Sequence, residues 1–97
     1  MRCVLSRKAE DDLEAIADYI ACDNPGRALT YITEIRERCH TIISYPEIAP
    51  LREEFGTGIR MVPFGRYLLF YTVHPEYVRI ERILAGERLL SSADFTS

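Results

Sequence analysis

The sequence contains no apolar run close to the roughly 20 residues that a membrane-spanning helix requires. Its first residues, MRCVLSRKAEDD, also lack the apolar segment that is typical of a secretory signal peptide. Both absences argue against export and against insertion into a membrane. We therefore expect a cytoplasmic protein.

Cysteine is scarce, and its spacing suits neither metals nor disulfides. The three cysteines, Cys3, Cys22 and Cys39, form neither a CxxC pair nor a Cys/His metal-binding set. An odd number of thiols is also poorly suited to a disulfide framework. We expect three inert, buried thiols, no metal site and no cofactor.

Excess positive charge is also lacking, because the net charge is −3. Domains that bind nucleic acid through its phosphates are usually basic. Residues 1–50 hold nine acidic side chains against six basic ones, whereas residues 51–97 hold six of each, and all six cations there are arginines. We expect no direct binding of nucleic acid, so any cationic surface should be a local patch of arginines.

The chain length of 97 residues fits one domain, since folding at this size buries roughly 60–65% of the surface of the extended chain. No internal repeat, low-complexity segment or linker divides it, so residues 1–97 are predicted to form a single domain. The stretch from about residue 87 to residue 97 is rich in serine but retains Leu89, Leu90 and Phe95. We expect it to be a partly docked tail.

Two segments in the first half show helical spacing of apolar residues. The first holds Ala9, Leu13, Ile16, Ala17 and Ile20, and the second holds Ala28, Ile32, Ile35, Cys39 and Ile42. Ser6 is placed to cap the first helix, and Asn24 to cap the second with Pro25 in its first turn. The pair Tyr45-Pro46 ends the second helix. We expect an antiparallel helical hairpin whose first helix exposes Asp11, Asp12, Glu14 and Asp18 to solvent.

Three apolar runs follow, Ile59–Pro63, Tyr67–His74 and Tyr77–Leu84, and only short breaks with Gly or Pro separate them. Connections this short predict an antiparallel three-stranded meander. The apolar segment Arg2–Leu5 is predicted to add a short strand at one edge. The fold class is therefore α+β, with a short N-terminal strand and an α-helical hairpin packed on a small antiparallel β-sheet.

A turn at Pro75-Glu76 sets the register of the last two strands. It pairs Val73 with Val78, Tyr71 with Ile80, Leu69 with Arg82 and Tyr67 with Leu84. Residues that share a face then form a core side of Leu69, Tyr71, Val73, Val78, Ile80 and Leu84, with Arg82 at its margin in need of a carboxylate or carbonyl partner. The opposite face carries Leu68, Phe70, Thr72, Arg79, Glu81 and Ile83. A face of this mixed character suits docking of another chain, or of the tail.

Residues 4–86 resemble the ParE-like toxins of bacterial type II toxin–antitoxin modules. The most specific parts are DLEAIADYIA with the following NP, GIRMVPFGRYLLFY, and the last strand VRIERIL. The resemblance implies the RelE/ParE toxin fold. It also implies a cognate antitoxin that lays an extended and helical C-terminal segment over the helical hairpin and the sheet edge, in a 2:2 or higher hetero-oligomer.

Two activities compete within that superfamily. RelE-like members are ribosome-dependent mRNA endonucleases, whereas ParE-like members are binders that poison DNA gyrase. Metal-free RNA cleavage needs a general base and a general acid. His40 fits a structural or solvated position and His74 an exposed one at a turn, while Tyr67 and Tyr71 fit core positions. Lys8 is the sole lysine, and residues 85–90 offer no group that titrates near neutral pH, so we predict no catalytic residue.

The end of the last strand departs from the common ParE pattern. Gly86 and Arg88 match that pattern, but Ala85 and Leu89 stand where relatives often have His and Asp. A weakened toxin, or one with an altered target that mainly binds its antitoxin, is therefore an alternative to both activities.

The arginine-rich sheet is predicted to hold a protein target, with DNA gyrase as that target. Its charged anchors would be Arg60, Arg66, Arg79, Arg82 and Arg88, and its apolar contacts would be Leu68 and Phe70.

Overall fold

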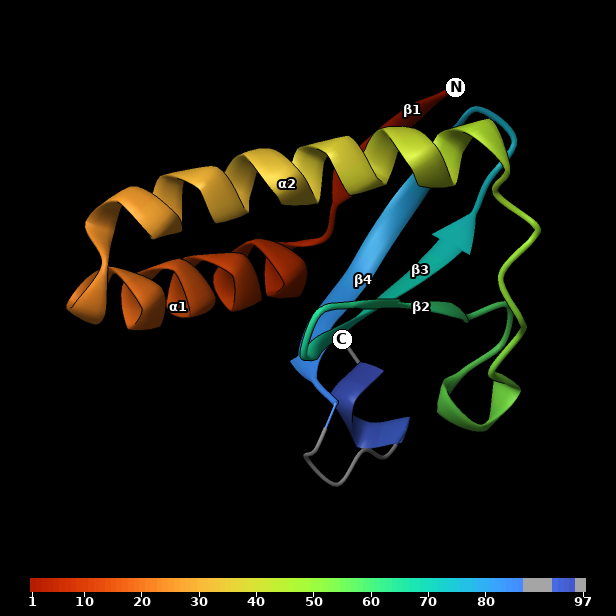
Figure 1. Cartoon of the computed structure of the whole chain (residues 1–97). Coiled ribbons are helices and arrows are strands. Elements are labelled where there is room, and N and C mark those ends of the chain that lie inside the picture. The colour runs from red at the N-terminus through yellow and green to blue at the C-terminus, as the bar shows by residue number, and fades with distance from the viewer. Residues whose placement is uncertain (87–91, 96–97) are drawn as a thin grey trace.

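The computed structural model describes residues 1–86 and 92–95. The elements are β1 (Arg2–Leu5), α1 (Arg7–Asp23), α2 (Pro25–Ser44), the 3-10 turn η1 (Glu53–Phe55), β2 (Arg60–Phe64), β3 (Tyr67–Val73), β4 (Tyr77–Ala85) and the 3-10 turn η2 (Ser92–Phe95). The two helices run antiparallel beside each other against the sheet (Figure 1). The predicted α+β fold is confirmed. None of the helices in the described part of the chain is long and apolar enough to cross a membrane.

The sheet has the strand order β1-β4-β3-β2. The meander β2-β3-β4 is antiparallel, as predicted, and β1 adds to its edge beside β4. This added strand runs parallel to β4, so the sheet as a whole is mixed. A parallel neighbour requires a long crossover, and the helical hairpin with its connector provides it.

Local capping signals set the helix boundaries. The Ser6 hydroxyl oxygen accepts a hydrogen bond from Ala9 N at 3.0 Å and so begins α1. Asn24 ends α1, because its N–H donates to Ile20 O, and it begins α2, because its Oδ1 accepts from Arg27 N at 3.0 Å. Both predicted N-caps are confirmed, and each belongs to the residue types that satisfy free N–H groups at a helix start.

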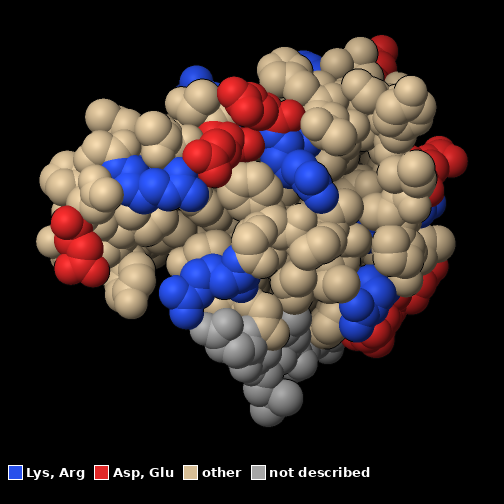
Figure 2. Space-filling view, viewed as in Figure 1, with Lys and Arg blue, Asp and Glu red and all other residues tan. Residues whose placement is uncertain are grey.

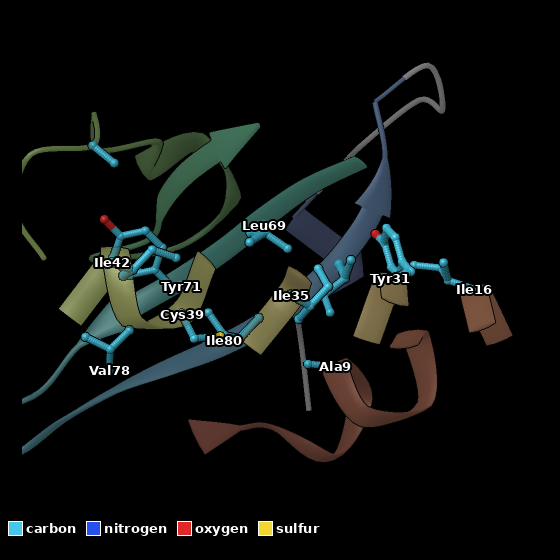
Figure 3. Close-up of a cluster of buried hydrophobic side chains, with 12 residues drawn as sticks. Ala9, Ile16, Tyr31, Ile35, Cys39, Ile42, Leu69, Tyr71, Val78 and Ile80 are labelled. Atoms are coloured by element: carbon cyan, nitrogen blue, oxygen red, sulfur yellow. The ribbon is translucent and has the colours of Figure 1, made fainter. Parts of the chain in front are cut away.

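The main core lies between the helices and the sheet (Figure 3). Its buried members are Ala9, Ile16, Tyr31, Ile35, Cys39, Ile42, Ala49, Leu69, Tyr71, Val78, Ile80 and Ile83. Most of these positions follow the predicted apolar stripes. Tyr31 was missing from the prediction, although its spacing from Ala28 and Ile35 places it on the same face of α2.

The predicted register holds only near the turn. Val73 faces Val78 and Tyr71 faces Ile80, but the ladder then shifts by one residue between Phe70 and Tyr71. Beyond that bulge the pairs are Phe70 with Arg82, Leu69 with Ile83, Leu68 with Leu84 and Tyr67 with Ala85. The predicted pairs Leu69–Arg82 and Tyr67–Leu84 were therefore wrong. Glu81 is the extra residue on β4, and a bulge of this kind reverses the facing of the residues that follow it.

The shift exchanges two core assignments. Ile83 joins the core on the helix side, where Leu84 was predicted, and Leu84 lies on the opposite face. There, Ile59, Phe70 and Leu84 form a second cluster, with Phe55 and Phe95 packed against it. The ring centroids of Phe70 and Phe95 are 4.8 Å apart.

Much of this opposite face is covered by the chain itself, through η1 and η2. Phe95 of the predicted tail packs on it, whereas the predictions for Leu89 and Leu90 lie outside the described residues.

Two buried tyrosines differ in their hydrogen bonding. The Tyr71 hydroxyl donates to Pro46 O at 2.8 Å, whereas the Tyr31 hydroxyl is buried without a hydrogen-bond partner among the described residues. We expect Tyr31→Phe to raise the free energy of unfolding by up to about 1 kcal/mol, and Tyr71→Phe to lower it by about 1 kcal/mol. Urea unfolding followed by circular dichroism measures both changes. A loss of stability in Tyr31→Phe as large as that in Tyr71→Phe would show that the Tyr31 hydroxyl has a partner.

The burial of Tyr31 also predicts how the stability of the protein changes at alkaline pH. Burial raises the pKa of Tyr31, while the phenol of an unfolded chain ionises near pH 10. Above about pH 10 the unfolded chain releases a proton that the folded chain keeps, so stability falls as the pH rises. Tyr31→Phe should flatten this fall, as measured by urea unfolding at pH values from 8 to about 11.

Candidate interaction surfaces

Asp12 and Arg82 form an ion pair between α1 and β4. The Asp12 carboxylate accepts from Arg82 Nε at 2.7 Å, from Arg82 Nη2 at 2.8 Å and from Ile83 N at 3.0 Å. The two side chains are only 14% and 15% exposed, respectively. The predicted need of Arg82 for a carboxylate or carbonyl is confirmed, because its Nη1 also donates to Asp94 O. The hydrogen bonds that Arg82 donates to Asp12 raise the pKa of Arg82, so the guanidinium stays charged.

The position of Asp12 follows from the length of β1. That strand pairs with β4 only as far as Leu5 and Ile80, so the next part of the β4 edge has no neighbouring strand. Asp12 caps this edge by accepting from Ile83 N. The prediction that Asp12 faces solvent was therefore wrong, while Asp11, Glu14 and Asp18 are exposed as expected.

A second polar cluster lies at the turn end of β3 and β4. The Thr72 hydroxyl donates to Glu81 Oε2 at 2.7 Å and lies 2.8 Å from His74 Nε2. Arg79 Nε donates to the same carboxylate oxygen at 2.8 Å. Because a hydroxyl has one proton and Thr72 gives it to Glu81, His74 Nε2 must be the donor to Thr72. A hydroxyl that acts as a nucleophile gives its proton to an adjacent base. In this structure the imidazole of His74 does not accept the proton of Thr72.

His74 is also less exposed than predicted. It is half-buried, and its ring stacks on Tyr77 with centroids 4.5 Å apart, so the prediction of a simply exposed side chain was wrong. The cluster borders a cavity of about 420 Å³ that Phe95 and the residues from Phe55 to Ile59 also line.

The remaining predicted site residues are spread over the sheet. Arg60 holds the connector after α2, with Nη1 donating to Glu47 O at 3.0 Å and to Ala49 O at 2.6 Å. Arg66 is exposed at the turn between β2 and β3. Arg79 is 40% exposed beside Glu81.

The apolar members of the predicted site differ in accessibility. Leu68 is half-buried, and Phe70 is fully buried beneath Phe55 and Phe95. Arg88 lies outside the described residues. The structure therefore brings Arg79 and Arg82 onto one strand but does not gather the predicted set into one patch. Figure 2 agrees, because on the face that it shows the basic side chains lie in separate patches with uncharged or acidic side chains between them.

A groove that the sequence did not predict lies between α1, α2 and β1. Its volume is about 510 Å³, and its apolar lining includes Leu5, Leu13, Ala17, Ile32 and Ile35. Acidic residues also line it, at Glu10, Glu14 and Asp18, together with Arg36. Each helical stripe was predicted separately, but the gap between them depends on the angle at which the helices pack.

The strand β1 beside this groove is the more open edge of the sheet. At the other edge, Leu51 pairs with Arg60 of β2, Met61 N donates to Pro50 O, and Pro63 has no N–H to offer. On β1, Ser6 N donates to Ile80 O at 2.9 Å. Backbone N–H groups alternate in direction along a strand, so that of Val4 points to β4 like that of Ser6. The N–H groups of Cys3 and Leu5 therefore point to the free edge.

The cysteines differ from the prediction in one respect. Cys39 is buried and Cys3 is half-buried, but Cys22 is exposed near the end of α1, so the expectation of three buried thiols was wrong for Cys22. It lies two residues beyond Ile20 and therefore off the apolar stripe. Among the described residues, no group of three or more His, Cys, Asp or Glu side chains is placed to hold a metal ion.

Comparison with known proteins finds a matching family and similar solved structures. The family model described as the ParE toxin of the type II toxin-antitoxin system parDE matches residues 3–90. A solved structure, from the chromosomal ParDE toxin–antitoxin system of P. aeruginosa, is similar with a TM-score of 0.75 and 24% identity, and the match covers 90% of this chain and 97% of that one. A search of curated proteins gives no match.

Proposed function

The chain belongs to the ParE toxin family of type II toxin–antitoxin systems, and from that premise we propose that it arrests growth by holding a protein target, DNA gyrase, rather than by cutting RNA. The hydrogen bonding of His74 is the observation that carries this proposal. His74 is the histidine nearest to the candidate arginines of β4, and it donates to Thr72, which donates to a carboxylate already paired with Arg79. In this network His74 Nε2 is engaged with Thr72, and the Glu81 carboxylate is engaged with Thr72 and Arg79, so we propose that neither serves as a general base.

We further propose that the cognate antitoxin occupies the groove between α1, α2 and β1. The groove offers an apolar floor for a helical segment, and the free edge of β1 offers backbone groups to an extended segment, as in recognition by an added β-strand. The acidic residues that line the groove favour a partner segment with apolar residues flanked by Lys or Arg. A 2:2 or higher complex remains our expectation.

The two competing functions act on different cellular targets, gyrase or mRNA on the ribosome, so experiments can distinguish them. We expect induced expression without antitoxin to stop growth and to raise a DNA-damage response, and the purified chain to inhibit supercoiling by gyrase. Co-expression with the protein encoded by the neighbouring reading frame is the matched control, and it should restore growth. Codon-specific cuts in mRNA on ribosomes would instead establish the RelE-like activity.

Expression that leaves growth unchanged would favour a weakened or altered-target toxin. Ala85 is the observation in favour of this alternative. It ends β4 opposite Tyr67, at the place where relatives often have a histidine. The matched experiment is Ala85→His, which should increase growth arrest under this alternative alone.

A further inference from the structure

Cys3 and Cys39 come from distant parts of the chain and meet beside the groove. Cys3 lies on β1 and Cys39 on α2, which pack against each other. Cys3 packs against the core cluster that contains Cys39, both thiols line the cavity of about 510 Å³, and they are close enough for each to shift the pKa of the other. Figure 3 shows Cys39 on the side of α2 that faces the sheet. We propose that these two residues form a reversible intramolecular disulfide that fastens the edge strand β1 to α2.

The thiols have complementary properties for this reaction. The neighbouring Cys3 thiol lowers the pKa of Cys39, whereas the neighbouring Cys39 thiol and burial raise the pKa of Cys3. Cys39 is therefore the better source of thiolate, which is the nucleophile in thiol–disulfide exchange. Cys3 is half-buried on an edge strand, so it has room to approach as the second thiol.

The oxidant is a small disulfide that fits the cavity. The Cys39 thiolate attacks one sulfur of that disulfide, forms a mixed disulfide and releases the first small thiol. Cys3 then loses its proton and attacks Cys39 Sγ, and the second small thiol leaves. The two protein thiols lose two electrons and two protons in all, and the small disulfide gains them as two thiols.

The consequence for binding rests on the function proposed above. The disulfide would join β1 to α2, which form two walls of the groove that we assign to the antitoxin. It would also restrict the movement of β1, whose free edge is proposed to bind the antitoxin. We therefore expect the oxidised protein to bind its antitoxin at least about tenfold more weakly than the reduced protein. Reduction with dithiothreitol should restore the affinity.

The disulfide itself is tested without any partner, on the full chain carrying Cys22→Ser. After treatment with cystamine and trapping of free thiols, peptide mass mapping should find Cys3 linked to Cys39 in a monomer. The link closes a loop that contains α1 and most of α2, so the melting temperature should rise by roughly 10 °C or more and return on reduction. Free thiols or separate cystamine adducts at positions 3 and 39 would overturn the proposal.

Two further variants serve as controls. Cys3→Ser and Cys39→Ser, each combined with Cys22→Ser, should stop at a mixed disulfide and show no gain in melting temperature. If either variant fails to fold, the peptide map of the Cys22→Ser protein still decides. A disulfide that forms but leaves antitoxin affinity unchanged would overturn the effect on binding alone, and a failure of the gyrase test would leave the disulfide standing.

Discussion

Replacing Asp12 with alanine is expected to lower the free energy of unfolding by about 3 kcal/mol and the melting temperature by roughly 10–20 °C. The substitution leaves the Arg82 guanidinium largely buried without its carboxylate and also removes the acceptor of Ile83 N. Both losses are costly because a buried polar group without a partner keeps its full desolvation penalty. Guanidinium chloride unfolding followed by circular dichroism measures the change.

The neighbouring residue provides a matched control. Asp11 pairs with Arg7 at 3.6 Å, but these side chains are 65% and 87% exposed, so Asp11→Ala should change stability by less than about 0.5 kcal/mol. The double variant Asp12→Ala with Arg82→Met should lose less than the sum of its single variants, because no unpaired charge remains. An Asp12→Ala protein as stable as Asp11→Ala would refute the structural importance of this pair.

The contrast between Asp12 and Asp11 shows where prediction from the sequence ends. Ser6, Asn24 and Pro25 act within one turn of their own positions, so their roles as helix signals were visible in the chain. The role of Asp12 depends on where β1 ends and on its partner Arg82, which lies 70 residues after Asp12 in the sequence. From local spacing alone, Asp12 and Asp11 are equivalent members of one acidic face.

The bulge at Glu81 is a second case of the same kind. Alternation and the turn at Pro75-Glu76 correctly paired Val73 with Val78 and Tyr71 with Ile80. No glycine or other local signal marks the extra residue, and Glu81 is held by Thr72 and Arg79 only once the strands are paired. Errors in the faces of Ile83 and Leu84 follow from this missed bulge.

The candidate surfaces were less predictable than the fold for the same reason. Arg60, Arg66 and Arg79 were chosen by residue type, but their contacts are set by which strand ends meet. The groove beside β1 needs three elements at once, so no segment of sequence contains its pattern. Two of its three acidic residues, Glu14 and Asp18, are nevertheless among those whose exposure the helical spacing predicted.

The second prediction with a large expected effect concerns Cys3, on the edge strand where we propose that the antitoxin binds. We expect Cys3→Pro to weaken binding of the antitoxin by about 30-fold or more, because the N–H at this position points to the free edge of β1. A proline there removes that donor and blocks the approach of an added strand. It leaves the ladder with β4 intact, since proline is tolerated on edge strands where the N–H faces outward. Binding is measured by calorimetry with the antitoxin under reducing conditions.

Cys3→Ala is the control for the loss of the thiol and of its packing. It keeps the backbone N–H, so it should bind the antitoxin within about threefold of the unmodified chain. Circular dichroism must show the same folded signal for both variants, because β1 packs against both helices. Equal antitoxin affinity of folded Cys3→Pro and Cys3→Ala would mean that no strand is added at β1, and the apolar groove alone would then have to account for the binding.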